Sequence, residues 1–519
     1  MEKVQILIVM CIYMTLVIGI GLYFSKRANS NSENYFLGGR SLGPWVAAMS
    51  AEASDMSGWL LMGLPGVAYF YGLSDAVWTA IGLLAGTYIN WLFVAKRLHS
   101  YSIIAGDSIT LPEFFSNRYK EKNKIIMTIA ALFIFVFFTV YASSCFKTVG
   151  KLFNSLFGVP YHYMMIAGAV FVIIYTFLGG FLAESASDFM QAVVMIIALT
   201  VVLITAVVYA GGPGEVYNNL KEIPGFLSFF GISSPELKDS VQQLSQSGRP
   251  LFGEAAPYGI FTILSTLSWG LGYFGMPQVL LRFMAIRRHR ELTQSRRIAT
   301  VWCAVSLIAA VLIGLVGRAA FPAEHLTSGA AENIFVTLST SLLPTVLAGF
   351  AMAGILAATI SSSDSYLLIA SSAASKNIFQ GLFKKNATEK QVMTVSRIIL
   401  LTVALIGIII AMDEKSVIFK VVAFAWAGFG ATFGPLMLFS LFWKRTTREG
   451  AIAGMLAGGI MVFLWKLVIK PIGGNIFGIY ELLPAFLLSC IAIVTVSLLT
   501  GEPEEDIRKE FDAAKAYTD

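Results

Sequence analysis

Four acidic residues, Glu52, Asp55, Asp188 and Asp364, stand inside strongly apolar stretches of this sequence. A fifth, Glu184, falls in what we expect to be a short loop between two such stretches. A charge inside an apolar segment is costly, so each of these acids is a functional hypothesis by default. The opposing interpretation is structural: Glu52 and Glu184 could pair with Arg40 or another base, and Asp364 could cap a helix or pair with a base.

A run of small residues that includes several hydroxyl groups follows at 357–363, with the letters AATISSS. Hydroxyl and carbonyl oxygens are the ligands that hard cations prefer. Small residues in a membrane helix also let two helices pack closely. The run by itself fits either role.

Two apolar segments are interrupted by glycine, proline and polar residues. One reads AEASDMSGW at 51–59 and then GLPG at 63–66, and the other reads WGLGYFGMPQ at 269–278. Irregular backbone inside a membrane is tolerated where it lines a cavity, and its free carbonyls and helix ends become ligands. A simple kink is the alternative for either segment alone. Paired breaks five helices apart favour a transporter with two inverted five-helix repeats and a midplane site.

Motifs for intramembrane catalysis are absent from the sequence. The four histidines, His99, His162, His289 and His325, all lie near the ends of apolar segments or in loops, and neither His-Glu-x-x-His nor Gly-x-Ser-x-Gly occurs. The four cysteines are scattered, without metal-ligand spacing. We therefore expect neither an enzyme nor an organic cofactor.

The elements that must position these residues are membrane helices. Of the 519 residues, 56% are hydrophobic and 13% charged, against about 25% charged in soluble domains. A span needs about 20 mostly apolar residues. We predict an all-α membrane protein of about thirteen spans: 4–24, 42–68, 73–97, 124–150, 162–180, 187–210, 256–284, 298–321, 333–374, 393–412, 417–443, 449–469 and 478–500. The ninth is too long, so a re-entrant or surface helix should precede a membrane helix near 347–374.

Basic residues predict the orientation. Most of the 37 lysines and arginines lie in segments that share one side if the N-terminus is outside and the C-terminus cytoplasmic. These clusters look like solvated loops, and none resembles a nucleic-acid patch. The polar segment 211–255 should then be an external loop, and 501–519 a cytoplasmic helix or tail. No soluble domain is predicted, and 1–500 forms a single transporter domain.

Several motifs make the chain resemble the sodium/solute symporter family, and within it the sodium/proline symporters. They are GGRSLGP at 38–44, ASDMSGWLLMG at 53–63, WGLGYFG at 269–275 and AFAWAGFGATFGP at 423–435, within a likeness from about residue 10 to 500. The resemblance implies a leucine-transporter-like fold. The span 4–24 would be an extra first helix, 42–210 the first repeat, 256–443 the second repeat and 449–500 two further helices.

The resemblance also implies a sodium site between the broken second span and the ninth. Its ligands would be the backbone carbonyls of Ala53, Met56 and Ala358 and the hydroxyls of Ser361 and Ser362. Beside it, a substrate site is implied at Ser57, Tyr141, Trp269, Tyr273, Pro277 and Gln278, with Asp55 as a coupling residue.

The chain departs from that subfamily at several of these positions. The subfamily usually has glycine at Glu52, a small or apolar residue at Glu184 and serine at Asp364, and continues the seventh span as Gln-Pro-His where this chain has Met276-Pro277-Gln278. Asp364 follows Ser361 by three residues and so shares its helix face. Two carboxylates in a low-dielectric pocket need compensation, so we hypothesise a second cation site, for sodium or a proton, at Ser57, Asp188, Asp364 and Ser365.

The predicted function is sodium-coupled import of a small amino-acid-like solute across the cell membrane, with proline favoured. The alternative solutes are another amino acid, a betaine-like osmolyte or a small organic acid. The alternative to sodium as the coupling ion is the proton. The expected partners are the solute, sodium and the lipid bilayer. The oligomeric state and the sodium stoichiometry are left open by the sequence.

Overall fold

The computed structural model describes residues 2–28 and 32–517 of the chain. Within that part, ten helices are long and apolar enough to cross a membrane, and three shorter apolar helices are Trp59–Tyr71, Tyr161–Phe177 and Ile260–Gly275. Each of the thirteen predicted spans overlaps one of these segments. Residues 1 and 29–31 of the predicted transporter domain and the last two residues of the predicted tail lie outside the described residues.

The first half of the chain contains the following elements: α1 (Glu2–Ala28), α2 (Ser32–Leu37), η1 (Gly38–Arg40), α3 (Pro44–Asp55), η2 (Trp59–Gly63), α4 (Leu64–Tyr71), α5 (Leu73–Ile89), η3 (Asn90–Val94), α6 (Ala95–Ile104), α7 (Leu111–Arg118), α8 (Ile125–Phe157), α9 (Tyr161–Tyr209), α10 (Pro213–Lys221), β1 (Gly231–Ile232), β2 (Leu237–Lys238), β3 (Val241–Gln242) and β4 (Ala256–Pro257).

The second half continues with α11 (Ile260–Leu267), η4 (Ser268–Gly275), α12 (Pro277–Ala285), η5 (His289–Glu291), α13 (Leu292–Ala320), α14 (Ser328–Ala331), α15 (Ile334–Leu342), α16 (Thr345–Ser372), η6 (Ala373–Phe383), α17 (Glu389–Ala411), α18 (Ile418–Phe442), α19 (Arg448–Leu464), η7 (Trp465–Ile469), η8 (Lys470–Ile472), α20 (Gly474–Phe477), α21 (Leu482–Leu499) and α22 (Glu505–Ala516).

Both predicted interruptions are present. The second span divides into α3 and α4, with Met56 out of helical geometry and a wide helical turn, η2, between them. The seventh span divides into α11 and α12, with the 3₁₀ helix η4 between them. Met276, which follows η4, is extended, and Pro277 then starts α12. Proline at a first helical position is favourable because its missing N–H would have no partner there.

The ninth predicted span divides as expected. The short helix α15 precedes the long, almost completely buried helix α16, and the two are separated by Pro344. Proline cannot continue a helix but readily starts one. The hydroxyl-rich run therefore lies inside α16, in the middle of the bundle.

The connection between spans five and six is a kink and is shorter than the predicted loop. The two helical parts of α9, Tyr161–Phe177 and Gly180–Tyr209, meet at this kink, where Gly180 has a non-helical φ of +56°. The ring of Tyr35 lies against Gly180 where a side chain would stand. A positive φ without steric cost requires glycine. Glu184 consequently lies on a helix, one turn from Asp188, and both side chains are buried.

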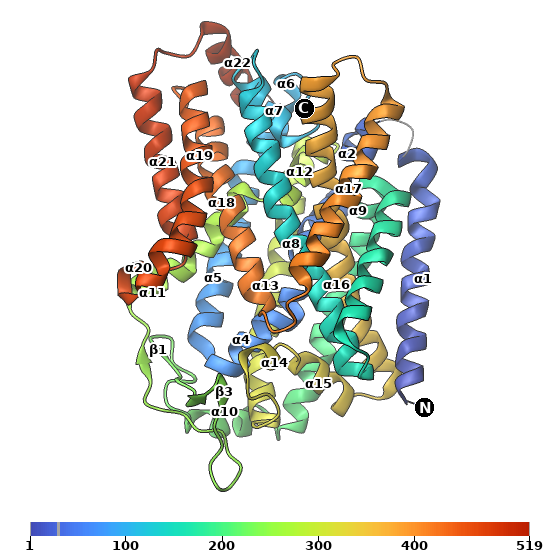
Figure 1. The fold of residues 1–519 in the computed structure, drawn as a ribbon, viewed down its shortest axis with the longest axis vertical. Coiled ribbons are helices and arrows are strands. Elements are labelled where there is room, and N and C mark those ends of the chain that lie inside the picture. Colours follow the sequence, from blue (N-terminus) through green and yellow to red (C-terminus); the bar gives the residue numbers. More distant parts are fainter. Residues whose placement is uncertain (1, 29–31, 518–519) are drawn as a thin grey trace.

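The two ends of the bundle differ (Figure 1). The start of α1, the strands and α10 lie at one end, and the C-terminal helix α22 lies with α6 and α7 at the other. We call these the N-terminal face and the C-terminal face. The predicted external segment contains the short helix α10, as expected, and also strands that were not expected: β2 pairs with β3, and β1 pairs with β4 just after the segment. The helical tail α22 was also expected.

Candidate functional site

The break after α3 faces the hydroxyl-rich stretch of α16. The Ser361 hydroxyl donates to the Ala53 carbonyl at 2.8 Å, and the Ser362 hydroxyl donates to the same oxygen at 3.3 Å. Ser361 also reaches the Ala358 carbonyl at 3.2 Å. All four residues are fully buried. The structure therefore brings together four of the five residues implied as sodium ligands.

Met56, the fifth, lies at the end of the broken helix. Its N–H closes the last turn on Glu52 at 2.9 Å, and its φ of −89° and ψ of +79° then take the chain out of the helix. The Met56 sulfur accepts a hydrogen bond from the Ser306 hydroxyl at 3.7 Å. Because the helix stops here, the last carbonyls of α3 lack the partners that a continuous helix would supply. They also lie at the negative end of a helix dipole, which favours a cation.

Asp55 links the two broken spans. Its carboxylate accepts a hydrogen bond from the Gln278 amide at 3.2 Å, and its backbone carbonyl accepts from Tyr141 at 3.3 Å and from Trp59 at 3.2 Å. Pro277, next to Gln278, is buried at the start of α12. Among the described residues, the other Asp55 carboxylate oxygen and the Ser57 hydroxyl have no hydrogen-bond partner. The Tyr273 hydroxyl and the Gln278 amide oxygen also have no hydrogen-bond partner in that part of the chain, so this centre contains several unpaired polar groups.

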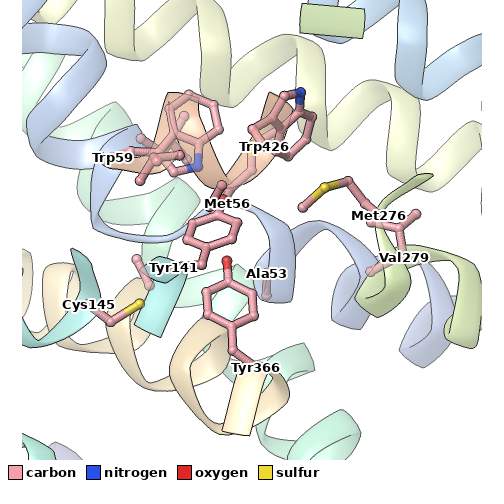
Figure 2. Packing of buried hydrophobic residues seen from close by; sticks show 14 of the residues in the cluster. Ala53, Met56, Trp59, Tyr141, Cys145, Met276, Val279, Tyr366 and Trp426 are labelled. Atoms are coloured by element: carbon pink, nitrogen blue, oxygen red, sulfur yellow. The ribbon is translucent and has the colours of Figure 1, made fainter. Parts of the chain in front are cut away.

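Aromatic rings surround this polar centre (Figure 2). Tyr141 and Tyr366 stack at 4.2 Å between centroids, below Trp59 and Trp426 in the view. Tyr273 meets Trp426 edge to face at 5.0 Å. Tyr141 and Tyr273 both lie near Asp55.

Trp269 lies farther toward the N-terminal face. Its ring packs on Phe419 at 5.1 Å, on Trp426 at 5.9 Å and on Tyr480 at 5.1 Å. Trp59 packs on Phe419 at 6.5 Å. We call Trp59, Trp269, Phe419 and Trp426 the aromatic layer. It separates the Asp55 centre from the N-terminal face, and Trp269 belongs to that layer.

A buried arginine, not identified from the sequence as part of any site, holds two of the predicted acids. Arg282 of α12 pairs with Glu184 and, at 3.3 Å, with Asp188. It also donates to Ser365 at 3.0 Å and to Ser50 at 3.0 Å. This arrangement bears out the structural interpretation of Glu184, with Arg282 and not Arg40 as the base. An arginine within an apolar span was the available signal.

Asp364 lies beside this cluster without a strong partner. One of its oxygens accepts the Ser365 N–H at 2.8 Å, and the other has no hydrogen-bond partner among the described residues. Asp364 and Glu184 line one small void together with Tyr175. Arg282 therefore bonds two of the three buried carboxyl groups in this region, and Asp364 is the third. Asp188 and Asp364 lie in one cluster, as the hypothesis of a second cation site requires. Arg282, however, already pairs with Asp188.

Glu52 is buried one turn before Asp55. Its carboxylate receives only the Trp91 indole N–H, at 3.4 Å, and its second oxygen has no partner among the described residues. Arg40, considered as its base, instead binds Asp107 at 3.0 Å and the Met284 carbonyl at 2.6 Å. The predicted pairing of Glu52 with Arg40 is therefore wrong.

The two ends of the site are closed to different degrees. At the C-terminal face, the Leu42 N–H donates to the Ala285 carbonyl at 3.1 Å, and the Arg287 N–H donates to the Leu42 carbonyl at 3.0 Å. These two hydrogen bonds join the start of α3 to the end of α12. At the N-terminal face, a cavity of about 390 Å³, which we call the outer cavity, reaches the aromatic layer at Trp269 and Phe419. The outer cavity thus ends at the aromatic layer, which covers the Asp55 centre on that side, while the contacts of Leu42 close the C-terminal face.

Known proteins of similar sequence match the chain over nearly its full length. The model of the sodium:solute symporter family matches residues 35–458. A sodium/proline symporter of Staphylococcus aureus (strain USA300 / TCH1516) is 42% identical, over 98% of this chain and 96% of its own length. The same protein of strain JH9 matches to the same extent.

Solved structures agree on the fold. A substrate-bound, outward-open sodium-coupled sialic acid symporter superimposes with a TM-score of 0.76 at 17% identity, covering 96% of this chain and 99% of its own. MhsT in complex with L-phenylalanine superimposes with a TM-score of 0.50 at 14% identity, covering 87% and 97%. The predicted leucine-transporter-like fold is confirmed. The match of the family model over most of the chain and the 42% identity to these relatives show that the chain belongs to the sodium:solute symporter family.

Proposed function

We propose that the protein is a sodium/proline symporter that imports its solute by alternating access. The observation that carries the proposal is the convergence of the Ser361 and Ser362 hydroxyls on the Ala53 carbonyl at the break of α3. The names of the relatives that are 42% identical support proline as the solute. Transport involves no chemical step on the solute and no organic cofactor.

Sodium would take the place of the hydrogen-bond protons between these oxygens. A hydroxyl that donates to a carbonyl can rotate its hydrogen away, and its oxygen then faces the cation together with the carbonyl. Ala53, Ala358, Ser361 and Ser362 supply such oxygens, and Met56 adds a carbonyl at the free helix end. The dipole of α3 favours the positive charge at that point.

The solute would bind between Asp55, Ser57 and the rings of Tyr141 and Tyr273. The free Asp55 oxygen suits the amine of an amino acid, and the free Ser57 hydroxyl suits its carboxylate. Aromatic faces suit both a cationic amine and an apolar ring. Pro277 and Gln278 form the wall on α12, and Trp269 covers the site from the aromatic layer.

We keep the hypothesis of a second cation at Ser57, Asp188, Asp364 and Ser365, in a modified form. Arg282 neutralises one carboxylate of the cluster, and the charge that is left supports binding of a proton or sodium near Asp364. The other Asp188 oxygen and the second Asp364 oxygen are both free of hydrogen bonds among the described residues.

We propose that the N-terminal face lies outside and the C-terminal face in the cytoplasm. The basic segments near α6, α7 and α22 support this orientation, because cytoplasmic loops carry excess lysine and arginine. The first repeat would comprise 42–210 and the second 256–443.

A proteoliposome screen tests the function. Labelled amino acids, glycine betaine and small organic acids would be presented with a sodium gradient and with choline in its place. Accumulation of L-proline that requires sodium is the expected result. Accumulation of another solute would reassign the cargo, and uptake that persists in choline and follows a proton gradient would reject sodium coupling.

A further inference from the structure

Tyr366 of α16 is a fully buried tyrosine that no motif in the sequence marks as part of a site. It follows Ser362 by four residues, and a side chain on a helix lies over the turn before it, so Tyr366 shares the face of Ser362. That face is turned to the break of α3, because the Ser362 hydroxyl donates to the Ala53 carbonyl. In Figure 2 the Tyr366 hydroxyl points away from α16, toward the centre where Ala53, Met56 and Tyr141 lie.

The ring of Tyr366 packs against two rings of α8. Its centroid lies 4.2 Å from that of Tyr141, with 28° between the planes, and 5.1 Å from that of Phe138, with 20° between the planes. A ring packed against two others cannot turn freely, so the direction of its hydroxyl is fixed. Tyr366 is therefore a rigid wall beside Tyr141, which we propose as a contact of the solute.

The hydroxyl at the end of this ring is unpaired. It has no hydrogen-bond partner in the part of the chain that the structure describes. Tyr141 and Asp55 lie near it, but Tyr141 uses its own hydrogen on the Asp55 carbonyl, at 3.3 Å. A buried hydroxyl without a partner is costly unless a ligand or a water molecule completes it.

The unpaired groups around Asp55 divide into acceptors and donors. When Asp55 is ionised, its second carboxylate oxygen accepts hydrogen bonds, as does the Gln278 amide oxygen. The hydroxyls of Ser57, Tyr273 and Tyr366 can donate them. Tyr273 lies beside the Asp55 carboxylate and can donate to it. Ser57 and Tyr366 are left as two donors, which matches the two oxygens of a carboxylate.

We propose that Tyr366 is a solute-binding residue, whose hydroxyl donates a hydrogen bond to the carboxylate of the solute alongside Ser57. The amine of the solute then faces Asp55. Because a hydrogen bond to an ionised acceptor is about twice as strong as one between neutral groups, this contact selects solutes with a free carboxylate. The proposal rests on the amino-acid solute proposed above and adds the group that recognises its carboxyl end.

Kinetics test the hydroxyl directly. Tyr366→Phe removes only the hydroxyl and keeps the stacked ring. In proteoliposomes with saturating external sodium, this variant should raise the KM for L-proline about tenfold, as expected from losing a hydrogen bond to a charged group, with the maximal rate unchanged. Tyr161→Phe is the matched control, because Tyr161 is also buried and its hydroxyl bonds the Ala411 carbonyl between α9 and α17. An unchanged KM in Tyr366→Phe would overturn the proposal.

A solute analogue separates the carboxylate contact from a general packing effect. L-prolinamide keeps the ring and the amine of L-proline but carries no carboxylate. As inhibitors of labelled L-proline uptake, L-proline should lose about tenfold in affinity in Tyr366→Phe, whereas L-prolinamide should lose almost none. Equal losses for both compounds would mean that the hydroxyl acts only through packing, and would refute the contact.

Uptake by the unmodified protein distinguishes this proposal from the proposed function. If the unmodified protein accumulates L-proline with sodium and Tyr366→Phe behaves identically toward both compounds, the contact is refuted and the function stands. If the unmodified protein accumulates no amino acid, the proposed solute class and this contact are rejected together.

Discussion

At the scale of single residues, the proposed sodium site depends on which hydroxyls of α16 point at the broken helix. Ser361 reaches across to Ala53, whereas Ser363, two residues later, bonds only its own helix, at Thr359 and Ile360. The helical period explains the difference, since residues two apart point to different sides. This contrast supplies a matched pair of variants.

Ser361→Ala should raise the sodium concentration for half-maximal uptake about tenfold. The reason is that the interaction of one polar oxygen with a charged group contributes about 1.5–3 kcal/mol to binding. Ser363→Ala should leave it unchanged. The measurement is proline uptake against external sodium in proteoliposomes with equal amounts of protein. Equal sodium curves for the two variants would show that Ser361 is not a ligand.

Arg282 holds a buried network that stability measurements can detect. Arg282→Met should lower the free energy of unfolding by about 3–5 kcal/mol, because it leaves Glu184 and Asp188 buried without a base. Adding Glu184→Leu should recover part of the loss. Thermal unfolding in detergent checks both, and a Tm of Arg282→Met equal to that of the unmodified protein would contradict the role given to Arg282.

At the scale of elements, the second break depends on close approach of backbones. A side-chain carbon on Gly86 of α5 would overlap the backbone of Gly270 in η4, and one on Gly270 would overlap the carbonyl of Gly82 in α5. The pair fixes η4, and with it Tyr273, against α5; Asn90 also donates to the Tyr273 carbonyl at 3.0 Å. The geometry of the proposed solute site is therefore set in part by glycines outside it.

Gly86→Ala should reduce sodium-driven uptake at least about tenfold, since forced overlap displaces the positioned residues. Gly214→Ala, in α10 with open space around it, should have no effect. Uptake rates per molecule of correctly inserted protein decide the matter, and normal transport by Gly86→Ala would show that this contact is dispensable.

Part of the element structure could be predicted from the sequence, for physical reasons. Length and apolarity identify the spans, and glycine with proline identifies both breaks. The connection through Gly180 was missed because one glycine at positive φ looks like any other glycine in an apolar run. The Arg282 cluster was missed because it joins residues about 90 positions apart, a contact that no local pattern reports.

At the scale of the whole molecule, the orientation predicts which face reagents reach. Lys221→Cys and Lys238→Cys, at the N-terminal face, should react with a membrane-impermeant thiol reagent added to intact cells. Lys385→Cys, in the connection between η6 and α17, should react only after the membrane is opened. The reverse pattern would invert the topology and place the outer cavity in the cytoplasm.

The central claim is that the oxygens at the break of α3 couple solute movement to sodium. The most direct measurement is the steady-state accumulation of L-proline in proteoliposomes as the sodium gradient is varied at zero membrane potential. We predict that the proline ratio rises with the sodium ratio, collapses when sodium is equal on both sides, and reverses when the gradient is reversed. A proline ratio that stays constant across all sodium gradients would contradict the account.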